Sequence, residues 1–273
     1  MIDVCGTGGD KLKTFNVSTT AAFVINSVGG TVAKHGNRSI SGIYGSADIF
    51  EYFGYDLNMP PQRVAEIIEK CGIGFMFAQK FHPAMKNVAE ARKILAARTA
   101  FNLLGPLSNP AGVKNQLVGV YSADYLERIV LLLKARGAEN VMSVLSHDGL
   151  DELSTTSKNQ ICHLKDGKAS IRILNPQDFG LVKSNLVDIQ VSSKDEALKS
   201  FITVLNGTAN RSMIEVTALN AAAGLIISGI ANDFQDAIPI ALESIKSGKS
   251  YDSFKDFIHL CGNMGKIEEF EKL

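Results

Sequence analysis

The chain has 273 residues, of which 45% are hydrophobic and 21% charged, and its 28 basic residues balance 28 acidic ones. This composition fits a globular protein of one large or two modest domains with a proper hydrophobic core. A formal net charge of zero produces no global field that would attract nucleic acid or an anionic membrane, so any anion site must come from local clustering.

The cysteines and histidines give no metal-site pattern. Four cysteines are scattered without a CxxC pair, and five histidines lack HxxxH spacing, so we expect reduced thiols and no zinc site. Apolar runs such as residues 129–133 are too short to cross a bilayer, and no basic segment leads a signal peptide. We therefore expect a cytoplasmic protein without membrane contact.

The first half of the chain alternates predicted strands and helices. Short apolar runs that stop at glycine predict strands, and longer periodic stretches bounded by proline, serine or glycine predict helices. This alternation is typical of a mostly parallel α/β sheet. The predicted strands are 1–5, 31–36, 73–78 and 116–121, and the predicted helices are 21–28, 45–54, 60–72, 83–104 and 123–137, the fourth of them ending before the GPLSNP motif.

The second half departs from this alternation. After a strand at 140–145, two alternating runs within 161–174 surround a Lys-Asp-Gly-Lys turn and predict a hairpin. From Lys194 the pattern is mostly helical, and the small and apolar residues of 212–229 indicate a helix packed on most sides. With no linker or internal repeat, we expect one α/β domain whose mixed, mostly parallel sheet is flanked by helices.

The first predicted strand runs into GTGGD, which places glycines where the strand meets the next helix. Open backbone N–H groups at such a turn can bind phosphate, but a tight structural turn explains the glycines equally well. The polar residues that follow, Asn16, Ser18, Thr19 and Thr20, favour phosphate because they supply more polar groups than one helix cap requires. Asp10 would repel phosphate unless Mg²⁺ lies between them, although aspartate is also a common turn residue.

Two further polar loops follow predicted strands. KHGNRSISG occupies residues 34–42, and GLDELS places Asp151 and Glu152 after the strand at 140–145. The carboxyl ends of parallel strands meet at one edge of a sheet, where α/β folds bind ligands. Either loop alone could be solvated surface. Together they predict a polyphosphate site in which the two carboxylates bind Mg²⁺.

The motifs GTGGD, NVST, KHGNRS, GSAD, FHPAMKNV followed by Arg92, NLLGPLSNP and GLDELS occur in this order. This combination resembles the anthranilate phosphoribosyltransferase family over almost the whole chain. The resemblance implies a catalytic α/β domain with a small helical subdomain, largely from about residues 45–110. It also implies transfer of the phosphoribosyl group from phosphoribosyl pyrophosphate to anthranilate, with release of pyrophosphate, in tryptophan biosynthesis.

The resemblance implies site residues as well. Two Mg²⁺ ions would be held by Ser18, Asp151 and Glu152, and no residue is assigned as a covalent nucleophile or general base. The residues implied for anthranilate are Gly6, Asn37 and Arg92, with His35 and His82 lining its approach. Those implied for the phosphoribosyl donor are Gly6, Gly9, Asp10, Thr14, Asn16, Val17, Ser18, Thr19, Lys34, His35, Gly36, Asn37, Arg38, Ser39, Ile40, Ser41, Gly42 and Ser46.

Two of these assignments have simpler readings. The planar guanidinium of Arg92 matches a substrate carboxylate, yet Arg92 could equally be a charge on a helix surface. His82 precedes Pro83 and could be only a helix-start residue.

The resemblance also implies several helices upstream of GTGGD, which build most of the small domain and the homodimer contact. Because the sequence as given starts only a few residues before Gly6, we expect these helices to be absent from it. Two other functions stay open. A pyrimidine nucleoside phosphorylase would share the fold and a glycine loop, but NVST and KHGNRS favour the transferase. A non-catalytic nucleic-acid-binding relative would need a basic surface, which the neutral composition opposes.

Overall fold

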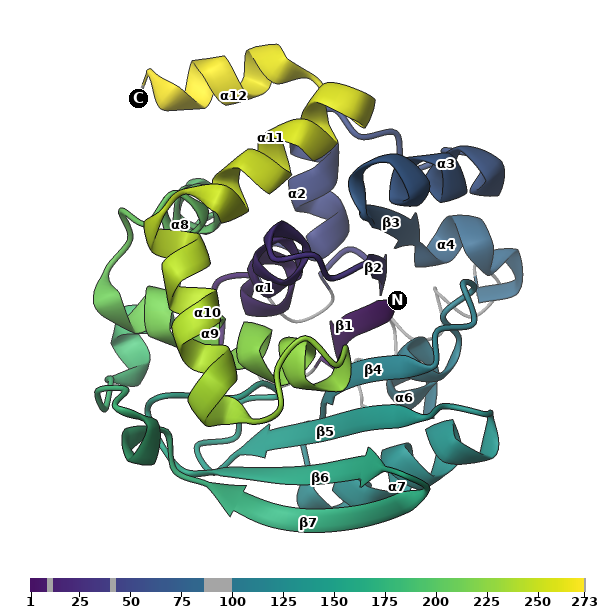
Figure 1. The fold of residues 1–273 in the computed structure, drawn as a ribbon. Coiled ribbons are helices and arrows are strands. Elements are labelled where there is room, and N and C mark those ends of the chain that lie inside the picture. The colour runs from purple at the N-terminus through teal and green to yellow at the C-terminus, as the bar shows by residue number, and fades with distance from the viewer. Residues whose placement is uncertain (9–11, 40–42, 86–99, 273) are drawn as a thin grey trace.

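The computed structural model describes residues 1–8, 12–39, 43–85 and 100–272 (Figure 1). Seven strands form one sheet in the order β3-β2-β1-β4-β5-β6-β7. The first five along the chain pair in parallel, and β6 and β7 are antiparallel to their neighbours, which confirms the predicted mixed sheet. The strands are β1 (Ile2–Gly6), β2 (Val32–Gly36), β3 (Ile73–Phe77), β4 (Asn115–Gly119), β5 (Asn140–Ser146), β6 (Asn159–Lys165) and β7 (Lys168–Leu174).

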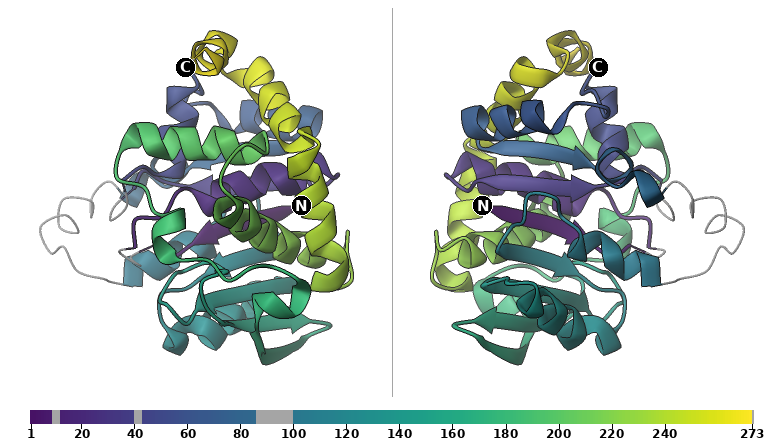
Figure 2. Two further views of the ribbon diagram at one scale, coloured as in Figure 1. Left: turned by 90° about the vertical axis from the view of Figure 1, so that its left-hand side faces the viewer. Right: turned by 90° about the vertical axis from the view of Figure 1, so that its right-hand side faces the viewer.

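Helices cover both faces of the sheet. In Figure 1, α1, α9 and α10 lie in front of the strands and α6 and α7 behind them, and the side views of Figure 2 show the same layers. The helices are α1 (Val17–Ser27), α2 (Ser46–Tyr52), α3 (Pro61–Cys71), α4 (Ala78–Phe81), α6 (Ala100–Leu107), α7 (Ala123–Ala135), α8 (Lys194–Leu205), α9 (Arg211–Ile227), α10 (Phe234–Lys246), α11 (Lys249–Cys261) and α12 (Met264–Glu271), with short 3₁₀ turns η1 (Pro83–Met85), η2 (Pro176–Phe179) and η3 (Leu186–Ile189).

Strand residues alternate between the two layers, as a doubly covered sheet requires. Val4, Leu117 and Val144 belong to the large core under α1 and α9, whereas Val118 and Val141 pack with the residues of α7. The helix predicted at 212–229 is buried along almost its whole length as α9, which confirms the expectation from its small apolar residues.

An aromatic cluster fills the space between α1 and α11. The ring of Phe23 lies 5.2 Å from Phe254, 5.7 Å from Phe257, 5.9 Å from Phe201 and 6.1 Å from Phe50, measured between centroids. Offset and edge-to-face contacts of this kind add to the hydrophobic stabilisation of a core. These five side chains come from α1, α2, α8 and α11, so the cluster joins the two ends of the chain.

The predicted hairpin is present as β6 and β7, with positive φ at both Asp166 (51°) and Gly167 (73°). Two successive residues of positive φ define the type I′ turn that suits tightly paired strands. Among the described helices, none is long and apolar enough to span a membrane.

The expectation that a helix would end before the GPLSNP motif is wrong. The backbone of α6 continues to Leu107, with Pro106 in its last turn. Proline there removes one helical hydrogen bond. The end of α6 is instead held by the sheet, because Gln116 Nε2 donates to the carbonyl oxygen of Pro106 at 2.7 Å. Most of the remaining predicted helix, 86–99, lies outside the described residues.

The division into a catalytic domain and a small helical subdomain stays a prediction. Residues 45–110 supply α2, α3, α4 and α6, but they also supply β3, which is the edge strand of the single sheet.

Candidate active site

The loop after β5 closes onto the glycine turn after β1. Asp151 accepts a hydrogen bond from the backbone N–H of Gly8 at 2.7 Å, across 143 residues of sequence. The approach is so close that a Cβ built on Gly6 would lie 2.6 Å from Asp151 Oδ2, and one on Gly119 would lie 1.4 Å from the carbonyl oxygen of Asp151. Glycine is required at position 119, because the clash there is with backbone, whereas a Cβ at position 6 would displace the carboxylate of Asp151.

The neighbouring carboxylate reaches the first turn of α1. Glu152 Oε1 accepts the backbone N–H of Ser18 at 3.0 Å. Lys34, on β2, donates to the carbonyl oxygen of Val4 at 2.5 Å and to Ser18 Oγ at 3.4 Å. Burial lowers the pKa of Lys34, while Asp3, Cys5 and Glu152 act in the opposite direction. The two acids, the glycine turn and Lys34 therefore share one end of the sheet, as the sequence predicted.

A second group of polar residues lies on the other face of β1 and β2, under α6. The fully buried carboxylate of Asp3 accepts the backbone N–H of His35 at 3.1 Å. The Nδ1 of His35 lies 3.3 Å from the carbonyl oxygen of Gly105. A carbonyl oxygen only accepts, so Nδ1 carries the proton and donates it to that bond. Nε2 of the neutral ring is then an acceptor.

His35 and His82 form a pair at this face. Their ring centroids are 5.1 Å apart and the rings are nearly perpendicular. In each ring Nε2 is buried and has no hydrogen-bond partner among the described residues. Burial lowers the pKa of His35 and the neighbouring His82 lowers it further, while Asp3 and the bond to Gly105 act in the opposite direction. A buried polar atom without a partner calls for an explanation, and a bound ligand is one.

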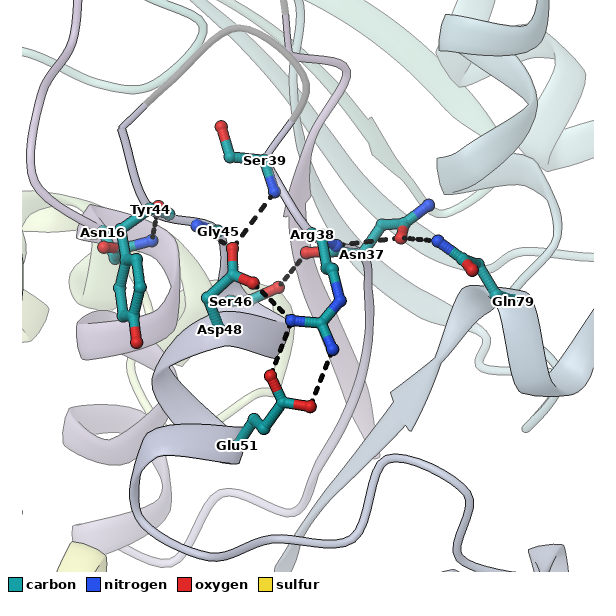
Figure 3. Close-up of polar contacts among 10 residues, drawn as sticks. All are labelled: Asn16, Asn37, Arg38, Ser39, Tyr44, Gly45, Ser46, Asp48, Glu51 and Gln79. Carbon is teal, nitrogen blue, oxygen red and sulfur yellow. Dashed lines mark hydrogen bonds and ion pairs between the residues drawn. The ribbon is translucent and has the colours of Figure 1, made fainter. Parts of the chain in front are cut away.

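The segment after β2 returns toward α2 through residues 37–39 and 43–46 (Figure 3). The carbonyl oxygen of Asn37 accepts the hydroxyl of Ser46 at 3.2 Å, which holds the two ends of the segment together. Asn16, just before α1, donates through Nδ2 to the carbonyl oxygen of Tyr44 at 2.8 Å. Asn16, the first residue of the NVST motif, thus contacts the end of this segment that lies next to α2.

Arg38 points along α2 and binds two acidic side chains of that helix. Its guanidinium donates to Asp48 at 2.7 Å and to both oxygens of Glu51, each at 2.7 Å. Glu51 and then Asp48 raise the pKa of Arg38, and the same bonds lower the pKa of Glu51. The contact of Arg38 with a phosphoribosyl donor stays a prediction.

Other predicted donor residues differ in what they can offer. The side chains of Val17 and Thr19 are buried in the protein interior, so only their backbone groups could face a ligand. Thr14 forms an isolated antiparallel bridge with Gln190. Six predicted residues lie outside the described part of the chain: Gly9, Asp10, Ile40, Ser41, Gly42 and Arg92.

The oxygen atoms at this edge suit Mg²⁺. Two carboxylates and the Ser18 hydroxyl are hard donors, and Mg²⁺ commonly takes one or two carboxylates together with substrate phosphates instead of a complete protein cage. Within the described ranges, no group of three His, Cys, Asp or Glu side chains could hold a metal alone. Thr7 Oγ1 and Asn16 Oδ1 are buried nearby without a hydrogen-bond partner among the described residues.

Comparison with known proteins assigns the family. A model of the glycosyl transferase family, a/b domain, matches residues 1–251. The chain is 60% identical over 269 residues to the anthranilate phosphoribosyltransferase of Nitrosopumilus maritimus (strain SCM1), covering 98% of this chain and 77% of that protein. The chain belongs to the anthranilate phosphoribosyltransferase family.

Solved structures agree with this family. The anthranilate phosphoribosyltransferase of Thermus thermophilus superposes with a TM-score of 0.88 at 37% identity, over 95% of this chain and 77% of that one. The Saccharomyces cerevisiae anthranilate phosphoribosyltransferase, solved in complex with PRPP and Mg, gives 0.84 at 29% identity, over 95% of this chain and 73% of that one. Members of the family thus bind the donor and the metal that the motifs predict.

Some residues that shape this candidate site are not indicated by the sequence analysis. Gly119 is predicted there only as part of a strand, although, like Gly6 and Gly36, it ends a parallel strand at the carboxyl edge. That shared position was the available signal. Asp3 and Gln116 carried none, because a polar residue inside an apolar run does not show which face or partner it will meet.

Proposed function

We propose that this chain transfers the 5-phosphoribosyl group of phosphoribosyl pyrophosphate to the amine of anthranilate, giving phosphoribosylanthranilate and pyrophosphate in tryptophan biosynthesis. The observation that carries the proposal is the closure of Asp151 and Glu152 onto the backbone amides of Gly8 and Ser18. It joins the acids, the glycine turn and the lysine of β2 at one end of the sheet, where a polyphosphate and its cation can be bound together.

The donor half of the site is the α1 face of β1 and β2. Lys34 supplies a positive charge for phosphate oxygens at that face, beside the glycine turn whose Gly8 N–H is bonded to Asp151. Ser18, Asp151 and Glu152 would hold Mg²⁺, and we propose two ions per subunit. When bound, Mg²⁺ neutralises the charge that develops on the leaving pyrophosphate.

The acceptor half lies at the same carboxyl end of these strands, on the side that faces α6, with His35, His82 and Asn37, so that the two substrates can meet beyond the strand ends. An aromatic amine is neutral at pH 7, so the reaction needs no base to create the nucleophile and no covalent intermediate on the protein. The Nε2 atom of neutral His35 can accept an N–H of the amine, and it can hold the proton that the amine loses after attack. Positioning the amine in line with the bond that breaks is the main task of these residues.

The test follows the fluorescence of anthranilate in the presence of the protein, phosphoribosyl pyrophosphate and Mg²⁺. We expect a loss of anthranilate fluorescence that requires all three additions and stops when a chelator removes the metal. Turnover of a pyrimidine nucleoside with phosphate, in place of this reaction, would contradict the proposal. Binding of duplex DNA at moderate salt without any transfer would favour the nucleic-acid-binding alternative.

The metal ligands can be tested by a double substitution. Replacing Asp151 with Asn and Glu152 with Gln keeps the side-chain shapes but removes both charges. We expect turnover to fall by about 10²-fold or more, since several kcal/mol of electrostatic stabilisation are lost, and the Mg²⁺ concentration for half-maximal rate to rise. An unaltered magnesium titration in the folded double variant would contradict the assignment.

Arg92→Ala should mainly weaken anthranilate binding, because the guanidinium is proposed to hold the substrate carboxylate. Loss of one charge-assisted pair corresponds to about 1.5 to 3 kcal/mol of binding free energy. Arg128→Ala, at an exposed position of α7, is the matched control and should leave the KM for anthranilate unchanged. If both variants have the same KM for anthranilate, the assignment of Arg92 to the anthranilate site is contradicted.

We further propose that the protein acts in the cytoplasm and assembles as the homodimer expected of the family. The four cysteines are free thiols in the structure, which agrees with a reducing compartment. Sedimentation at several protein concentrations measures the assembly directly.

A further inference from the structure

Asp48 and Glu51 lie on α2, outside the residues expected to touch either substrate, yet they organise the segment that follows β2 (Figure 3). Oδ2 of Asp48 accepts the backbone N–H of Gly45 at 2.9 Å and that of Ser39 at 3.4 Å. Its other oxygen accepts Arg38 at 2.7 Å. One carboxylate thus holds both sides of the returning segment.

This geometry exceeds what a helix cap requires. An acidic residue at the third position of a helix normally accepts the N–H of the capping residue, and the bond from Gly45 fulfils that role. The bonds from Ser39 and Arg38 are additional and come from the other side of the segment. A Cβ on Gly45 would lie 2.2 Å from the nitrogen of Ser39, so the two sides are in contact at this point.

Glu51 fixes the guanidinium that Asp48 also binds. It accepts two parallel bonds from Arg38, and Arg38 also lies over the ring of Phe77 on β3, with 5.9 Å between Cζ and the centroid. Paired bonds of this kind fix orientation as well as distance. The side chains of Arg38 and Glu51 are 42% and 52% exposed, and pairs this exposed contribute little to stability. Their effect is on local geometry.

The charges also decide what Arg38 can do. One guanidinium faces two carboxylates, so the three side chains together carry negative charge. Such a group does not attract phosphate. In this arrangement Arg38 ties the backbone of its own segment to α2 through Asp48 and Glu51.

We propose that Asp48 and Glu51 are positioning residues for the phosphoribosyl donor: through Arg38 and the backbone amides of Ser39 and Gly45, they hold residues 37–39 and 44–46 in the form that binds it. The inference rests on the proposed function and extends it. Neither acid touches the substrates. Both act by keeping Asn37 and Ser46 bonded to each other, in a segment whose Tyr44 is tied to Asn16 at the start of α1.

Glu51→Gln gives a test in which the two roles of Arg38 predict opposite signs. If Arg38 positions the segment, loss of the Glu51 charge loosens it, and the KM and Kd for phosphoribosyl pyrophosphate with Mg²⁺ rise by about five- to tenfold. If Arg38 binds phosphate directly, removing its competing partner lowers both constants. The anthranilate KM should change by less than about twofold, because the substitution leaves the acceptor side intact.

Two further variants complete the test. Asp48→Asn should raise the donor Kd more than Glu51→Gln, because Asp48 binds both sides of the segment. Glu66→Gln breaks a comparable exposed pair, Arg63 with Glu66 at 2.9 Å on α3, and should leave the donor Kd unchanged. The thermal midpoint of Glu51→Gln should stay within about 4 °C of the unsubstituted protein, as expected for an exposed pair.

The outcomes separate this inference from the function on which it rests. An unsubstituted chain that neither binds the donor nor consumes anthranilate would overturn both. An active chain in which Glu51→Gln leaves the donor Kd unchanged, or lowers it, would overturn the positioning role alone.

Discussion

The aromatic cluster between α1 and α11 and the polar carboxyl edge of the sheet are built in opposite ways. The cluster packs Phe23 against four other rings with no polar partner to satisfy. At the carboxyl edge, Asp151 and Glu152 bind the backbone amides of Gly8 and Ser18, and nearby Asn16 and Thr7 retain buried oxygens without partners among the described residues. The cluster maximises buried apolar area, whereas the edge keeps polar atoms ready for a ligand. Stability and binding should therefore respond to different substitutions.

The largest expected effect is on the cluster. Phe23→Ala removes the central ring, and the cavity left behind should lower the free energy of unfolding by about 3 to 5 kcal/mol. Urea unfolding measures the loss, and Leu131→Ala, at a 47% exposed position of α7, should cost less than about 0.5 kcal/mol. If Phe23→Ala, kept folded at low temperature, also shows a large rise in the KM for the donor, the separation between stability and binding would be contradicted.

A smaller effect is expected at the boundary between the two regions. Gly119→Ala places a methyl group on the carbonyl oxygen of Asp151, and the loop must move to relieve the overlap. Overpacking of this kind costs about 1 to 3 kcal/mol of stability. Because the displaced residue is a proposed metal ligand, we also expect a higher Mg²⁺ requirement.

The matched variant for this boundary is Gly137→Ala. Gly137 has positive φ but open space around its Cβ position, so alanine introduces backbone strain without contact with the site. A loss of stability with a normal magnesium titration is expected there. An identical Mg²⁺ titration in Gly119→Ala and Gly137→Ala would show that Asp151 still binds the metal after its loop has moved.

The smallest expected effect is the dependence of stability on pH from a histidine outside both regions. Burial lowers the pKa of His163, on β6, to about 4, with Arg172 and Lys165 acting in the same direction. The unfolded chain therefore binds a proton below about pH 6.5 that the folded chain does not. Stability should fall as the pH drops from 7 to 5, by at most about 1.4 kcal/mol per pH unit from this group.

His163→Gln should make that decline shallower. It also alters the 2.8 Å contact between His163 Nε2 and Asn140 Oδ1, so stability at pH 8 serves as the reference for the lost bond. His259→Gln, at an exposed position of α11, is the control. An identical pH slope in the two variants would contradict the assigned cause.

The sequence predicted most of the sheet and the meeting of its loops, for physical reasons that particular residues illustrate. The hairpin turn at Asp166 and Gly167 and the apolar runs of β1 to β5 are local signals, and parallel order then brings strand ends to one edge. The end of α6 was predicted wrongly, since Gln116 of β4, the next element along the chain, binds the carbonyl oxygen of Pro106 in the last turn of the helix.

The contacts that set the site geometry could not be predicted. The hydrogen bonds that join Asp3 to His35 and Gly8 to Asp151 depend on strand register and loop path, which no local pattern encodes. The bond between Arg38 and Glu51 likewise arises only when α2 folds back on the end of β2.

The strand order has a consequence for biosynthesis of the chain. β1 pairs with β2 along one side and with β4 along the other, and the carboxylate that meets Gly8 comes later still, at Asp151. Gly8 and Ser18 are synthesised long before Asp151 and Glu152, so their backbone N–H groups can form these hydrogen bonds only late in elongation. The donor-binding edge is therefore completed late in translation, and such distant pairing slows folding and lengthens the period in which chaperones can bind.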